Sequence, residues 1–72
     1  MKKKALWTVI HMTRGQEKAD MILAALQAEG FMARSTRMSR VMSDTEDDFE
    51  ILVIASEAEE AQQFLIERGL LL

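Results

Sequence analysis

The sequence predicts a single domain of the α+β class, with its elements in the order β-α-β-β-α. Segments rich in β-branched, aromatic and other apolar residues favour strands at 6–12 and 49–54, and alternating side chains favour a third strand at 31–38. Two segments carry apolar residues at helical spacing and end at a glycine, at 16–29 and 57–68. A chain of 72 residues accommodates one such domain and no more.

The first predicted strand contains the only Trp and the only His of the chain. Side chains alternate between the two faces of a sheet along a strand. Leu6, Thr8 and Ile10 are therefore expected on one face. The residues expected on the opposite face are Trp7, Val9 and His11.

The first predicted helix covers 16–29 and has one apolar stripe, formed by Ala19, Ile22, Leu23 and Leu26. Thr13 and Gln16 have the spacing of a capping box, and Gly15 is a competing N-cap. Gly30 stands where a left-handed C-terminal cap is expected. The helix should therefore begin at about Gln16 and end just before Gly30.

The strand at 31–38 is less hydrophobic than the other two, which is typical of an edge strand with one polar face. The strand at 49–54 is almost entirely apolar. Between them, residues 39–48 hold neither Gly nor Pro, so no tight turn is specified. We expect a loose, acidic loop there.

Ser56 and Glu59 form a capping-box pattern at the start of the second predicted helix. Its buried face is expected to be Ala58, Ala61, Phe64 and Leu65. Gly69 ends the helix, and an apolar tail of three leucines follows. This tail, Leu70–Leu72, either docks against the sheet or adds a short fourth strand.

These elements assemble into a ferredoxin-like plait that lacks a full final strand. A right-handed crossover makes the first two strands parallel. The third strand then inserts between them, antiparallel to both, which gives the order 2-3-1 with two helices on one face. The first strand is left at an exposed edge, where Leu70–Leu72 or a second copy of the chain could cover it.

Composition predicts a binding protein and not an enzyme. No Cys is present, and a lone His11 cannot make a structural zinc site, so neither a disulfide nor a metal is expected. No nucleophile–base pair, cofactor motif or catalytic residue is recognisable. Lys2–Lys4 precede an apolar run too short for a signal peptide, and no stretch could span a membrane, so a cytoplasmic location is expected.

Charge is distributed unevenly along the chain. Residues 1–43 carry eight Lys/Arg and three Asp/Glu, a net of +5, while residues 44–72 carry one Arg and nine Asp/Glu, a net of -8. The halves could attract each other within one fold or across a dimer, or simply form solvated faces. Nucleic acid is not expected, since Arg34 and Arg37 would face opposite sides of a strand and the chain is acidic.

Two candidate binding sites follow. Trp7, Val9 and His11 are expected to line the open sheet face or strand edge, and to bind a second copy of the chain or another protein. The alternative is a small anionic metabolite held by Arg14, Gly15 and Lys18, because backbone N–H groups at a helix start attract anions.

The chain also resembles the prokaryotic signal-transducing protein family, a family of small domains of unknown function. Three segments carry the resemblance: Trp7-Thr8-Val9-Ile10 through Gly15, Ala19-Asp20-Met21 through Glu29-Gly30-Phe31, and Phe49-Glu50-Ile51-Leu52-Val53 with the acidic helix that follows. The chain departs from the family in having Ile54-Ala55 where Pro is frequent, and an acidic middle loop. The resemblance implies a plait fold and a signalling role, with no catalytic residues.

Overall fold

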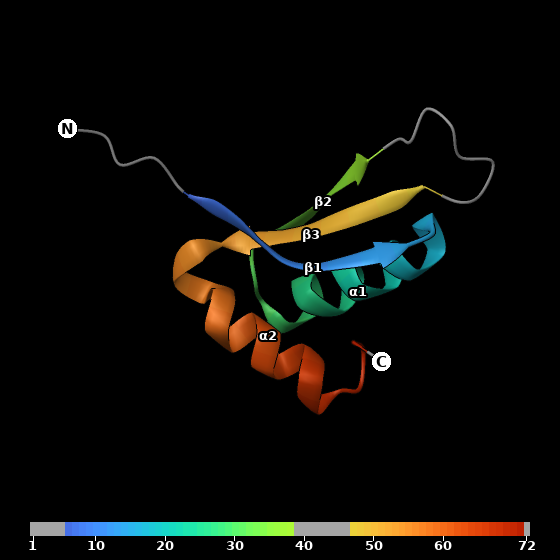
Figure 1. Cartoon of the computed structure of the whole chain (residues 1–72). Helices are drawn as coiled ribbons and strands as arrows, with labels where there is room; N and C mark the ends of the chain where they lie inside the picture. The colour runs from blue at the N-terminus through green and yellow to red at the C-terminus, as the bar shows by residue number, and fades with distance from the viewer. Residues whose placement is uncertain (1–5, 39–46, 72) are drawn as a thin grey trace.

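The computed structural model describes residues 6–38 and 47–71 (Figure 1). The elements in chain order are β1 (Trp7–Arg14), α1 (Gln16–Glu29), β2 (Ala33–Met38), β3 (Asp48–Ile54), the 3-10 turn η1 (Ala55–Glu57) and α2 (Ala58–Glu67). The predicted bounds of α1 match these residues. β1 runs two residues further than predicted, and β2 begins two residues later.

The three strands form one antiparallel sheet in the order β1-β3-β2. The strand at the centre, β3, is the last of the three in the chain. Figure 1 shows α1 and α2 together beneath the sheet. The α+β class, the strand order and the presence of two helices are thus as predicted, and the other sheet face bears neither helix.

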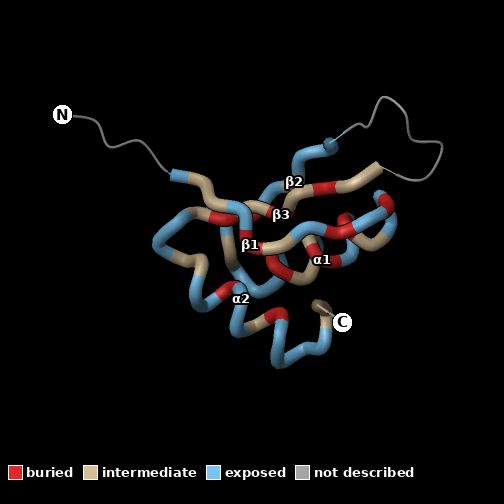
Figure 2. The backbone as a smooth tube through the Cα atoms, viewed as in Figure 1, coloured by how far each residue is buried: buried red, intermediate tan, exposed pale blue. Residues whose placement is uncertain are grey.

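The core lies between the sheet and the two helices. In β3 every second residue is buried, and these residues are Phe49, Ile51 and Val53. They meet the predicted stripe of α1, in which Ala19, Ile22 and Leu26 are buried and Leu23 is half-buried (Figure 2). From α2, Ala61 and Leu65 are fully buried, while Ala58 and Phe64 pack at the edge of the core.

A β-bulge interrupts β1. Val9 pairs with Leu52 and His11 pairs with Ile51, which leaves Ile10 as an extra residue. Because residues directly opposite one another share a face, His11 lies on the side of buried Ile51, facing the helices. The Nε2 of Gln62 donates a hydrogen bond of 3.2 Å to the Ile10 carbonyl in the bulge. The predicted common face of His11 with Trp7 and Val9 is therefore wrong.

Neither predicted capping box forms. Thr13 belongs to the lengthened β1, opposite Phe49, and Gly15 is the N-cap of α1 with a φ of 91°. Residues Ala55–Glu57 form a 3-10 turn before α2, which places Ser56 inside that turn. Glu57 becomes the N-cap residue of α2, and its carboxylate instead accepts the Met32 N–H at 3.1 Å.

The described part of the C-terminal tail docks against the core and forms no strand. Gly69 has a φ of 69°, and the Leu70 N–H donates to the Leu65 carbonyl at 2.9 Å. Leu70 and Leu71 are half-buried against the core. Leu72 and most of the predicted acidic loop, 39–46, lie outside the described residues.

Candidate interaction surface

The sheet face turned away from α1 and α2 is called the open face here. Its members follow from the strand register, since they pair with one another and alternate with the buried residues. They are Trp7, Val9, Met12 and Arg14 from β1, Arg34, Thr36 and Met38 from β2, and Asp48, Glu50, Leu52 and Ile54 from β3. Three of its apolar side chains are 40–50% exposed: Val9 41%, Met12 50% and Met38 40%.

One end of the open face is apolar and contains the single Trp. Trp7 pairs with Ile54, and Val9 pairs with Leu52. The Arg34 guanidinium lies over the Trp7 ring, 4.1 Å from its centroid, and so reaches across the central strand. This cation–π contact favours an orientation of the Trp7 ring against the sheet.

The other end of the open face is charged. Arg14 pairs with Asp48, with 3.3 Å between its Nε and the carboxylate oxygen. Glu50 lies on the same strand as Asp48. Neither Glu50 nor Arg34, which belongs to the apolar end, has an ion pair among residues 6–38 and 47–71. In total the described open face carries two Arg and two acidic residues, so its net charge is zero.

The structure separates His11 from the other two predicted contact residues. Trp7 and Val9 lie together on the open face, whereas His11 is half-buried on the helix side. Desolvation by burial lowers the pKa of His11 below its usual 6.5, and the positive charge of Lys18 on α1 lowers it further. The neutral form of the ring is therefore favoured in the folded chain.

This placement predicts a pH dependence of stability. The folded pKa of His11 is lower than the unfolded pKa, so the full free energy of unfolding is present above pH 6.5. As the pH falls below that value, the unfolded chain binds the proton more readily than the folded chain, and the free energy of unfolding decreases. We expect NMR titration of the His11 ring to give a pKa below 6.5, and Lys18→Gln to raise it. Lys18→Arg, which keeps the charge, is the control. A wild-type pKa above 6.5 would contradict this account.

The three residues of the predicted anion site are already engaged in other interactions. Arg14 pairs with Asp48, and the Gly15 N–H donates to the Asp47 carbonyl at 2.9 Å. Lys18 lies close enough to His11 to affect its pKa. A surface cavity of about 390 Å³ adjoins Arg14, but the Asp48 carboxylate also lines it and would repel an anion.

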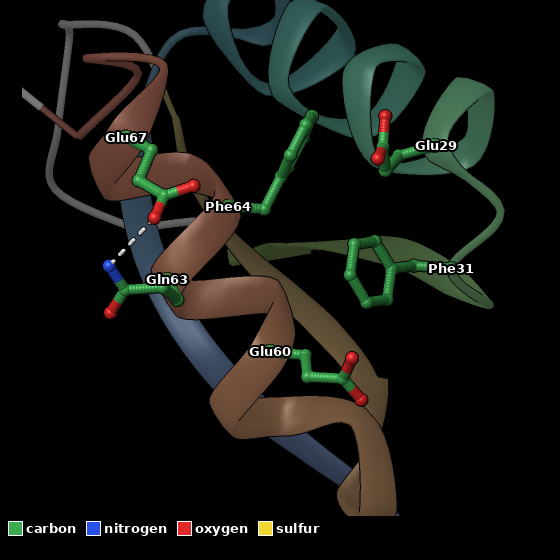
Figure 3. Close-up of a pocket in the computed structure, with 6 residues that line it drawn as sticks. All are labelled: Glu29, Phe31, Glu60, Gln63, Phe64 and Glu67. Carbon is green, nitrogen blue, oxygen red and sulfur yellow. Dashed lines mark hydrogen bonds between the residues drawn. The ribbon is translucent and has the colours of Figure 1, made fainter.

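A groove that sequence reasoning missed lies between the end of α1 and α2 (Figure 3). Its volume is about 270 Å³, and the residues that line it are Glu29, Phe31, Glu60, Gln63, Phe64 and Glu67. We name it the acidic groove. Phe31 was expected in a strand and Phe64 in the core, and nothing in their spacing of 33 positions predicts that the rings meet.

Two aromatic rings form the apolar part of the acidic groove. The Phe31 and Phe64 centroids are 5.9 Å apart, with the ring planes at 50°. In Figure 3 the Glu29 and Glu60 carboxylates lie on either side of this pair, and Gln63 is hydrogen-bonded to Glu67 at 3.2 Å. The Arg68 guanidinium lies 5.0 Å from the Phe64 centroid and 4.0 Å from Glu29.

Within the described ranges, no three His, Asp or Glu side chains gather in a way that could hold a metal ion. None of the described helices has the length and apolar character needed to cross a membrane. The resemblance to the signal-transducing family stays a prediction. No family model matches this chain, and no curated protein or solved structure matches it either.

Proposed function

We propose that this chain is a small protein-interaction module with a ferredoxin-like plait fold, which acts as a homodimer through its open face in a regulatory or signalling role. The observation that carries the proposal is the apolar end of that face, where Trp7, Val9, Leu52 and Ile54 lie together on a surface without a helix. Aromatic residues and Met are enriched in protein interfaces, and the open face as a whole carries Trp7, Met12 and Met38.

The shape of the surface supports a protein partner over a small molecule. A three-stranded sheet presents a broad, slightly twisted surface, whereas small-molecule sites are concave and enclose most of their ligand. The open face offers exposed Val9, Met12 and Met38 spread over two edge strands. Such a spread suits another sheet or strand better than a compact ligand.

Charge supports a second copy as the partner. An interface between identical faces requires that each positive group can meet a negative one, and the open face has two of each sign. Arg34 pairs with Leu52 across the strands, and Glu50 is two residues from Leu52 on β3. A two-fold axis that lies in the interface plane close to Leu52, diagonal to the strands, would bring Arg34 of each copy within reach of Glu50 of the other.

Size predicts that the dimer is weak. The three strands of the sheet lie about 4.8 Å apart, and each is about seven residues long at about 3.3 Å per residue. The open face therefore has a flat area of roughly 330 Å². A standard stable interface buries about 800 Å² of accessible surface per partner. An interface formed by the open face alone would belong to the small, transient class of protein–protein interfaces. Association is therefore expected at high micromolar concentrations and above.

Sedimentation equilibrium up to millimolar concentration tests the proposal. Wild type is expected to associate reversibly, and Val9→Glu to weaken association at least about tenfold, because each dimer would bury two charges in an apolar contact. Met21→Glu is the matched control, since Met21 is 51% exposed on α1, away from the open face. A wild-type monomer at millimolar concentration, or equal effects of both variants, would overturn the proposal.

A further inference from the structure

We propose that the acidic groove binds the guanidinium group of an arginine side chain presented by a basic peptide. The groove lies on the helix side of the molecule, between α1 and α2, so this site is independent of the open face (Figures 1 and 3). Its volume of about 270 Å³ is ample for one side chain and too small for a folded domain.

The chemistry of the groove matches a planar cation with several donors. Phe31 and Phe64 are half-buried and supply the faces on which a guanidinium can stack. Glu29 and Glu60 flank the rings and supply acceptors for its N–H groups. The groove thus combines an apolar floor with negative charge at its rim, which is the complement of an arginine side chain.

A guanidinium of the chain itself already binds at the edge of the same residues. Arg68 stacks over Phe64 at 5.0 Å and lies 4.0 Å from Glu29. This intramolecular contact shows that Phe64 and Glu29 accept a guanidinium together. Three glutamates line the groove, whereas Arg68 does not. If the charge of Arg68 is set against that of Glu29, the lining keeps a net charge of -2.

The geometry also predicts selectivity between arginine and lysine. An ammonium group is a compact, strongly hydrated point charge, whereas a guanidinium stacks on an aromatic ring and donates along its plane to carboxylates. A site that attracted cations by charge alone would bind both equally. The paired Phe rings should favour arginine by about two- to fivefold.

NMR titration with N-acetyl-argininamide tests the proposal, with N-acetyl-lysinamide as the comparison ligand. We expect saturable amide shifts confined to residues 29–31 and 60–67, with weaker binding of the lysine derivative. Glu60→Gln should weaken binding about two- to fivefold, and Arg68→Ala should strengthen it, because Arg68 competes for Glu29 and Phe64. Phe31→Leu should remove the preference for arginine while keeping the charge.

Glu59→Gln is the matched control, since it removes the same charge one residue away, on the same helix, from a side chain that does not line the groove. Equal weakening by Glu59→Gln and Glu60→Gln would show a diffuse charge effect and overturn the proposal. Equal affinity for the two ligands, or no saturable shift at residues 60–67, would also overturn it. Spectra of each variant without ligand confirm that it is folded.

Discussion

Replacement of Leu65 by Ala is expected to lower the free energy of unfolding by about 2–5 kcal/mol, as is usual for a fully buried leucine. Leu65 is completely buried between α2 and the sheet. A domain of this size has a total stability of roughly 4–10 kcal/mol. The variant should therefore lose roughly half of the stability of the domain. Urea denaturation followed by far-UV circular dichroism would measure the loss.

Ile66→Ala provides the control for this expectation. Ile66 is the next residue of the same helix and is 58% exposed. Its replacement removes a similar apolar side chain without leaving a cavity, so the free energy of unfolding should change by about 0.5 kcal/mol or less. Similar losses in both variants would mean that α2 packs on the sheet differently from the way described above.

Charge reversal at Arg34 or Glu50 is expected to weaken the proposed dimer at least about tenfold. In Arg34→Glu, each copy would place a glutamate over Glu50 of the other, and Glu50→Arg would create two pairs of arginines. Both residues lie on the open face, and neither has an ion pair within the described part of the chain. Sedimentation of each variant alone would measure the loss.

A mixture of the two variants separates the proposed contact from an effect within one copy. In a heterodimer of Arg34→Glu with Glu50→Arg, one contact joins glutamate to arginine and the other joins the native Glu50 to the native Arg34. Association of the mixture should therefore recover to nearly the wild-type strength. Arg14→Glu, which disrupts a pair already formed with Asp48, should not be rescued by Glu50→Arg. Failure of the mixture to recover would contradict the two-fold arrangement.

The spacing of apolar residues along the chain was enough to predict an element such as α1, whose buried side chains all face the same core. The stripe Ala19, Ile22, Leu26 predicts α1 because each of those side chains packs on the same side of one helix. Gly30 ends α1 in the left-handed region, as expected, with a φ of 102°. The central position of β3 agrees with its apolar composition, because a strand that is paired on both edges favours such residues.

Features that depend on partners distant in the sequence were not predictable in the same way. The bulge at Ile10 results from the register with β3 and is supported by Gln62, which lies 52 positions away. The predicted capping boxes failed because β1 continues through Thr13 and because a 3-10 turn occupies Ser56. The acidic groove arises where the turn after α1 brings Phe31 next to Phe64, a contact that no local periodicity encodes.

The position of β3 at the centre of the sheet has a consequence for how the chain folds as it is made. Within the sheet, β1 and β2 each pair only with β3, and every one of those strand pairings waits for residues 48–54. While the first half of the chain emerges from the ribosome, α1 can form locally but neither strand has a partner. Assembly of the sheet should therefore be one late, cooperative step, with a rate governed by closure of the long β1–β3 connection.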